Sequence, residues 1–148
     1  DQAPDRGSAP AGKGKAELPT PRAAQDEERA LVYLDPACRR AKDDGLGTLG
    51  QFIYYDAMVF HGPGTGPTGF YGLRERARRE ADTPAEGGSQ RTYLDVFLDL
   101  RRQAMRSRRP GIDTTRIDTA QRQFLYDGNL DLRTPLVWKV YGETYKVP

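Results

Sequence analysis

The sequence predicts a small, mainly α-helical domain that follows an N-terminal arm. All 8 Tyr, all 5 Phe and the single Trp lie at position 33 or beyond, so the material for a hydrophobic core is confined to the later part of the 148 residues. Apolar residues recur there at helical spacing, in segments separated by short runs rich in Gly and Pro. A chain of this length has room for one domain of ordinary size.

Residues 1–24 are expected to form a disordered arm rich in Pro, Gly and Ala. This segment has no aromatic residue, and Leu18 is its one large aliphatic residue. Such a composition cannot bury enough surface to offset the entropy lost on ordering. The folded unit is therefore expected to cover residues 25–148.

Two helices are predicted at the start of this unit. Asp35 followed by Pro36 is typical of an N-cap and a first helical position, which begins a short helix that ends near Gly45. Residues 49–60 are apolar on nearly every side, which predicts a helix buried in the middle of the domain. It ends at the loop His61-Gly62-Pro63-Gly64.

Three further helices are predicted at about 68–81, 89–107 and 113–126. The first has a charged face, and the second has an apolar stripe that includes Phe97 and Met105. The third helix is expected to end at Asp127-Gly128-Asn129, a sequence typical of the turn that follows a helix. The residues from Thr134 onward are expected to be irregular or briefly extended.

A buried polar cluster is predicted around Asp56, which lies in the middle of the apolar helix. An unpaired carboxylate there would cost several kcal/mol, so Asp56 must be protonated or paired with a cation. Arg101 shares an apolar stripe with Leu98, and Arg116 shares one with Phe124, which makes both arginines candidate partners. The cluster would either fix helix register alone or hold a catalytic group.

The composition excludes several classes of protein and site. No apolar segment is long enough for a membrane helix, so a membrane partner is not expected. Cys38 and His61 cannot complete a zinc site, and neither a metal nor another cofactor is expected. A net charge of +2 makes a nucleic-acid partner a minor alternative, based on Arg101, Arg102, Arg106, Arg108 and Arg109. His61 would cap or pack a helix end, or face a ligand that approaches the glycine loop.

Several longer motifs carry a resemblance to a known family. The runs DEERALVYLDPA, AKDDGLGTLGQFIYYDAMVFHGPG, TYLDVFLDLRRQAM and TTRIDTAQRQFLYDGNLDL resemble the C-terminal half of the family 46 glycoside hydrolases, over about residues 25–148. The resemblance implies the C-terminal helical lobe of a lysozyme-like, two-lobed fold. It also implies a secreted, extracellular chitosanase, which hydrolyses β-1,4 links between glucosamine units of chitosan with inversion.

The resemblance also assigns roles to residues. Asp56, Arg101 and Arg116 match a buried network behind the catalytic glutamate of the family. Tyr33, His61, the loop Gly62-Pro63-Gly64 and, more weakly, Asp113 match positions along the cleft that binds chitosan or glucosamine oligosaccharides.

The chain departs from the family pattern in two places. The general-acid glutamate and general-base aspartate of the family lie in an N-terminal lobe, which residues 1–24 do not resemble. We therefore expect a truncated chain without catalytic residues that is inactive alone; a non-catalytic aminoglucan-binding module is the alternative. Arg108 stands where family members tend to carry an acid.

Overall fold

The computed structural model describes residues 30–148, and the predicted arm lies outside this range. The helices of the described part are α2 (Leu34–Asp43), α3 (Thr48–His61), α4 (Phe70–Glu80), the 3₁₀ turn η1 (Pro84–Glu86), α5 (Gln90–Arg108), the π-helix η2 (Arg116–Gln121) and α6 (Arg122–Tyr126). They are followed by the strands β1 (Leu136–Val140) and β2 (Glu143–Val147). The mainly helical fold predicted from the sequence is therefore confirmed.

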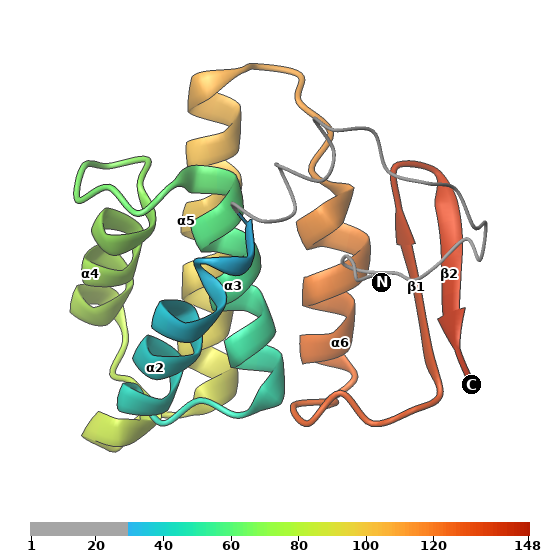
Figure 1. Cartoon of the computed structure of the whole chain (residues 1–148), viewed down its shortest axis with the longest axis horizontal. Coiled ribbons are helices and arrows are strands. Elements are labelled where there is room, and N and C mark those ends of the chain that lie inside the picture. The colour runs from blue at the N-terminus through green and yellow to red at the C-terminus, as the bar shows by residue number, and fades with distance from the viewer. Residues whose placement is uncertain (1–29) are drawn as a thin grey trace.

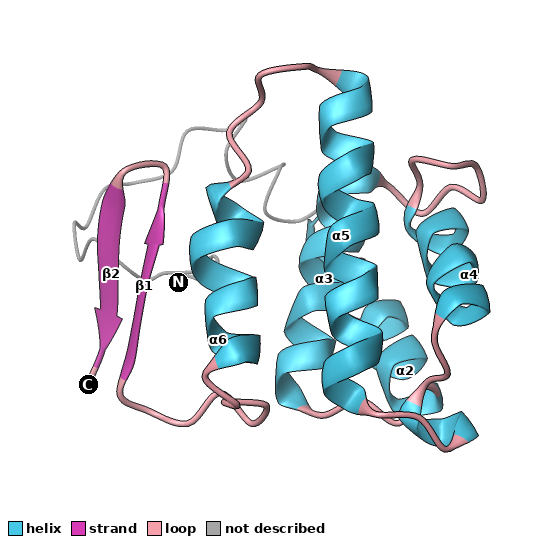
Figure 2. Cartoon of the chain, turned by 180° about the vertical axis from the view of Figure 1, so that it is seen from behind, coloured by secondary structure: helices cyan, strands magenta, loops and turns pink. Residues whose placement is uncertain are grey.

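The elements are arranged side by side around α3 and α5 (Figure 1). Helices α2 and α4 lie on one side of these two, and η2 with α6 lies on the other. The β1–β2 hairpin forms the outer flank beyond α6, as the view from behind also shows (Figure 2). No helix of the described part is long and apolar enough to cross a membrane.

The start of α5 is capped by a side chain, whereas the start of α2 is not. Ser89 accepts a hydrogen bond from the backbone N–H of Thr92 at 3.2 Å, and α5 begins directly after it. Helix α2 instead begins at Leu34, with Tyr33 at the N-cap and no side-chain cap. The predicted capping role of Asp35 is thus wrong; this carboxylate lies in the first turn, where the helix dipole favours it.

Helix α3 is less enclosed than its composition predicted. One face is fully buried and contributes Ile53, Tyr54 and Ala57 to the core. On another face Phe52 is 36% exposed and Val59 is 38% exposed. The expectation of burial on every side is therefore wrong, because the elements of the described part cover this second face incompletely.

A second buried polar cluster ties the helices together, and the sequence did not indicate it. Asp44, which is 3% exposed, receives two hydrogen bonds from the guanidinium of Arg74, at 2.8 and 2.7 Å. The hydroxyl of Tyr54 donates to the same carboxylate at 2.6 Å and contacts the hydroxyl of Tyr93 at 2.6 Å. The cluster therefore links the end of α2 with α3, α4 and α5. Arg74 belongs to the charged face that was predicted for the helix at about 68–81.

The C-terminal residues form a regular antiparallel hairpin. Leu136 pairs with Val147 and Val140 with Glu143. Trp138 of β1 packs against Phe124 of α6, with ring centroids 5.7 Å apart. The hairpin is thus anchored to α6 through an aromatic contact.

Candidate functional site

Arg101 and Asp56 form the centre of a polar cluster between α3, α5 and η2. The Arg101 side chain is 0% exposed, and its Nη1 donates to Oδ2 of Asp56 at 3.1 Å. The same nitrogen donates to Oε1 of Gln121 at 2.7 Å. Nη2 of Arg101 has no hydrogen-bond partner among residues 30–148. The guanidinium is therefore held firmly on one side, and one of its nitrogens remains available.

Arg116 and Gln121 complete the cluster from η2. Nη1 of Arg116 lies 3.3 Å from Oδ1 of Asp56, and Nε2 of Gln121 donates to Oδ2 at 2.8 Å. Residues five apart are offset by about 140° around an α-helix. The wider turn of the π-helix reduces this offset, so that both ends of η2 reach the same carboxylate.

These contacts fix the charge of the cluster. Burial raises the pKa of the Asp56 carboxyl, but the positive charges of Arg116 and Arg101 and the hydrogen bond from Gln121 outweigh this effect. The pKa of Asp56 is therefore lowered, and the group is a carboxylate at neutral pH. The predicted cluster of Asp56, Arg101 and Arg116 is present in the structure.

His61 joins this cluster at the end of α3. It is 6% exposed, and its Nε2 accepts a hydrogen bond from Nε of Arg101 at 3.1 Å. Burial and the charge of Arg101 lower the pKa of His61 to about 3, so the imidazole is neutral with its proton on Nδ1. This Nδ1 is buried and has no hydrogen-bond partner in the described part of the chain.

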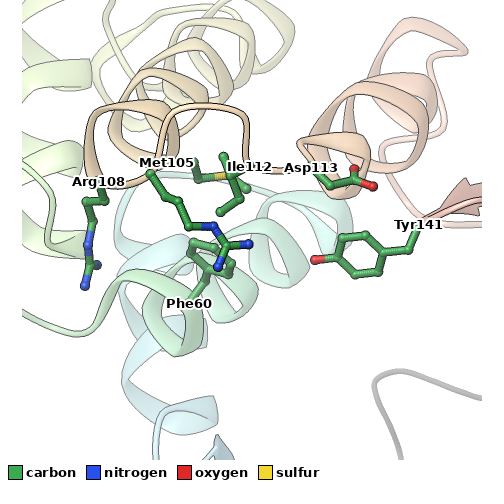
Figure 3. A pocket seen from close by; sticks show the side chains of 7 residues that line it. Phe60, Met105, Arg108, Ile112, Asp113 and Tyr141 are labelled. Carbon is green, nitrogen blue, oxygen red and sulfur yellow. The ribbon is translucent and has the colours of Figure 1, made fainter.

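A pocket of about 520 Å³ opens beside the cluster (Figure 3). Its walls come from the ends of α3 and α5, from the segment that follows α5 and from the turn of the hairpin. They are formed by Phe60, Met105, Arg108, Arg109, Ile112, Asp113 and Tyr141. The guanidinium of Arg116 connects pocket and cluster, since it lies 5.2 Å from the ring of Phe60 and 5.9 Å from the ring of Tyr141.

Hydrogen bonds hold the hairpin side of the pocket in place. Oδ1 of Asp113 accepts from the backbone N–H and the hydroxyl of Thr115, at 2.7 and 2.6 Å, which lowers the pKa of Asp113. The hydroxyl oxygen of Thr115 in turn accepts from the backbone N–H of Tyr141 at 2.8 Å. Tyr141 has a φ of 54°, a left-handed conformation that is costly for a bulky residue. Strain of this kind is concentrated at functional sites.

The other residues predicted for the cleft are dispersed. Tyr33 lies at the start of α2 and packs against the hydrophobic core. Pro63 and Gly64 are exposed and do not line the pocket. Gly62 follows from the fold itself, because it has a φ of 78°. The carbonyl of Gly64 accepts a hydrogen bond from the backbone N–H of Tyr71. Asp113 alone among the cleft predictions lines the pocket.

Phe60, Gln121 and Tyr141 are among the residues of the site that were not predicted. Phe60 could have been found from its place beside His61, at the end of the central helix. Gln121 is five residues from Arg116, a spacing that an α-helical pattern does not bring together. Tyr141 lies far along the chain, and only the hairpin places it at the pocket. Within residues 30–148, no group of three or more His, Cys, Asp or Glu could hold a metal ion.

Comparisons with known proteins agree on one family. The model of the family described as "Glycosyl hydrolase family 46" matches residues 4–136. The chitosanase of Streptomyces sp. (strain N174) is 56% identical over 124 residues, which are 84% of this chain and 45% of that protein. The chitosanase of Nocardioides sp. (strain N106) is 47% identical, with 84% and 44% covered.

Solved structures show the same relationship. The co-crystal structure of chitosanase OU01 with substrate matches with a TM-score of 0.79 and 51% identity, over 86% of this chain and 54% of that chain. The complex of the Gynuella sunshinyii GH46 chitosanase with chitotetraose matches with a TM-score of 0.76 and 28% identity, over 87% and 57%. The chain thus spans about half the length of these relatives. The family match also begins at residue 4, within the segment in which the sequence showed no resemblance.

Proposed function

Because the chain belongs to glycosyl hydrolase family 46, we propose that it supplies one half of the substrate cleft of a secreted endo-chitosanase. Its substrate would be chitosan, hydrolysed at the β-1,4 links between glucosamine units with inversion. Chitosanases similar to this chain have been solved with substrate and with chitotetraose, which supports a carbohydrate ligand. The pocket beside Arg116 is the place at which we expect such a chain to bind.

The observation that carries this proposal is the incomplete hydrogen bonding of the Asp56–Arg101–Arg116 cluster. Buried donors are almost always paired, yet Arg101 Nη2 and His61 Nδ1 have no partner among residues 30–148. A carboxylate brought to this cluster would satisfy such donors and would be held by guanidinium groups. We propose that the cluster positions the general-acid glutamate and that Asp56 keeps the two arginines in place.

The acid and the base themselves are proposed to come from a part of the protein that residues 25–148 do not include. Inversion requires a carboxylic acid on one face of the glycosidic bond and a carboxylate that activates water on the other. The Asp56 carboxylate is occupied by Arg101, Arg116 and Gln121, so it is not free for either role. We therefore expect this chain alone to bind chitosan oligosaccharides without cleaving them at an appreciable rate.

Binding of a glucosamine hexamer tests this proposal, followed through the backbone NMR signals of the labelled chain. We expect saturable shifts that are centred on Phe60, Arg116 and Tyr141. Arg116→Met should weaken binding at least fivefold, while Arg133→Met, which changes an exposed arginine that does not line the pocket, should leave the affinity unchanged. Absence of binding, or shifts confined to other surfaces, would refute the proposal.

The same titration separates the hydrolase from a purely aminoglucan-binding module. Both bind the hexamer, but a module would not need the cluster for any reaction. Two results together would favour a binding module without hydrolase activity. Asp56→Asn would bind the hexamer with unchanged affinity, and no mixture of the chain with the rest of a related chitosanase would hydrolyse it.

A further inference from the structure

We propose that Gln121, at the end of the π-helix η2, is a positioning residue for Arg116. The amide of Gln121 orients the carboxylate of Asp56, and this carboxylate in turn holds the Arg116 guanidinium beside the pocket. The inference rests on the proposed function, in which the oligosaccharide binds beside Arg116. Gln121 itself is 1% exposed and does not line the pocket, so it would act on the ligand without contacting it.

The two oxygens of the Asp56 carboxylate have different partners. Oδ2 accepts hydrogen bonds from Nη1 of Arg101 at 3.1 Å and from Nε2 of Gln121 at 2.8 Å. Oδ1 lies 3.3 Å from Nη1 of Arg116. The carboxylate cannot rotate without breaking both hydrogen bonds to Oδ2, and breaking buried hydrogen bonds is costly. Oδ1 is therefore kept directed at Arg116.

The amide of Gln121 is itself fixed in one orientation. Its Oε1 accepts a hydrogen bond from Nη1 of Arg101 at 2.7 Å while its Nε2 donates to Asp56, so the three side chains form a triangle of hydrogen bonds. The opposite orientation would place the amide NH₂ against the guanidinium and the amide oxygen against the carboxylate, which are two repulsive contacts. The triangle therefore fixes Asp56 relative to Arg101.

Arg116 depends on this triangle more than Arg101 does. Arg101 is fully buried and donates hydrogen bonds to three side chains. The Arg116 side chain is 28% exposed, and Asp56 is its one ion-pair partner within residues 30–148. The Arg116 guanidinium also lies 5.2 Å from the ring of Phe60 and 5.9 Å from the ring of Tyr141. The position of this guanidinium at the two rings therefore follows that of Oδ1.

The backbone of η2 is anchored by contacts that do not involve Gln121. The hydroxyl of Thr119 donates a hydrogen bond to the carbonyl of Lys139 in β1. Oδ1 of Asp118 accepts a hydrogen bond from Nε of Arg102 in α5 at 3.0 Å. These contacts tie the π-helix to the hairpin and to α5. A substitution of Gln121 should therefore break the triangle and leave the π-helix in place.

Gln121→Met in the full chain tests the inference, because methionine keeps the length of the side chain and removes both hydrogen bonds. The side-chain NMR signals of Arg116 report the position of its guanidinium through the ring currents of Phe60 and Tyr141. We expect Gln121→Met to shift these signals in the free chain. It should also weaken binding of the glucosamine hexamer about threefold or more. Gln121→Asn, whose shortened amide cannot span the triangle, should do the same and replaces Gln121→Met if that variant does not fold.

Gln123→Met is the matched control. The same substitution is made two positions further along, at an exposed glutamine whose amide contacts Asp127 on the surface. It should change neither the Arg116 signals nor the affinity for the hexamer. Thermal unfolding of each variant verifies that it folds.

A double-mutant cycle separates positioning from a general loosening of the fold. In the Arg116→Met background, Gln121→Met should lower the affinity for the hexamer by less than about 1.5-fold, because Gln121 acts through Arg116. Equal losses in both backgrounds, an unchanged affinity or unchanged Arg116 signals in Gln121→Met would each overturn the inference. If the unmodified chain does not bind the hexamer, the proposed function is refuted, and the Arg116 signals of the free chain alone decide whether Gln121 positions Arg116.

Discussion

Arg101, a fully buried arginine on α5, donates a hydrogen bond of 3.1 Å to Asp56 on α3, across 45 residues of sequence. Arg116 approaches the other oxygen of the same carboxylate at 3.3 Å. The three side chains thus place one negative charge between two positive charges in the helical part. We expect this arrangement to contribute to the stability of the fold, and the proposed role of the cluster depends on it.

Replacing Asp56 by Ala should lower the free energy of unfolding by about 3 kcal/mol or more. The change leaves the Arg101 guanidinium buried without a counter-charge, which is the costly way of breaking a buried pair. Urea denaturation of the two proteins measures the difference. Asp99→Ala is the control, because the carboxylate of Asp99 is 59% exposed and its pairing with Arg122 should contribute less than about 1 kcal/mol. Equal effects of the two substitutions would contradict the buried-pair interpretation.

His61 should not titrate between pH 5 and pH 8. It is the only histidine in the sequence, so its ring-proton NMR signal is free of overlap with other histidines. Burial and the charge of Arg101 lower its pKa to about 3 from an ordinary value of 6.5. A midpoint near 6.5 would contradict the burial of His61 beside the charge of Arg101.

The lowered pKa of His61 should make the folded chain less stable at acidic pH. Between pH 6.5 and about pH 3 the unfolded chain binds a proton at His61 that the folded chain does not. The free energy of unfolding should therefore fall as the pH falls through this window, by at most ~1.4 kcal/mol per pH unit. His61→Gln should flatten the dependence between pH 6.5 and pH 4, measured by urea denaturation. If His61→Gln shows the same change of the free energy of unfolding with pH, groups other than His61 cause this dependence.

Arg74→Met should lower the free energy of unfolding by about 3 kcal/mol, because it leaves the buried carboxylate of Asp44 without its cation. Arg78→Met on the same helix is the control, since the ion pairs of Arg78 within residues 30–148 are 3.4 Å long and involve exposed partners. Thermal or urea unfolding ranks the two variants. A larger loss for Arg78→Met would contradict the assignment of Arg74 to the core.

Tyr141→Gly should separate binding from stability. Glycine tolerates the φ of 54° that strains tyrosine, so the free energy of unfolding should change by less than about 1 kcal/mol. Removal of the ring from the pocket should weaken oligosaccharide binding about threefold or more, a loss typical of one aromatic contact. Leu132→Gly, at a φ of 52° and away from the pocket, should leave the affinity unchanged. Unaltered affinity in Tyr141→Gly would exclude the ring from the site.

The sequence predicted the parts of this molecule that local patterns determine. Helical spacing placed Asp56, Arg101 and Arg116 on apolar faces, and a carboxylate in an apolar helix requires a cation, so the cluster could be inferred. The partnership of Asp44 with Arg74 could not be inferred, because both residues lie in charged local surroundings that suggest solvent exposure. The pocket was also missed, since Tyr141 reaches it through a hairpin whose position depends on Trp138 and on η2.

The most direct test of the central claim is the release of reducing ends from soluble chitosan. It compares this chain alone with its mixture with the part of the Streptomyces sp. (strain N174) chitosanase that the chain does not match. We predict no release above background by the chain alone, and turnover in the mixture that Arg116→Met reduces at least tenfold. Clear turnover by the chain alone would contradict the account, because it would mean that these 148 residues supply their own acid and base.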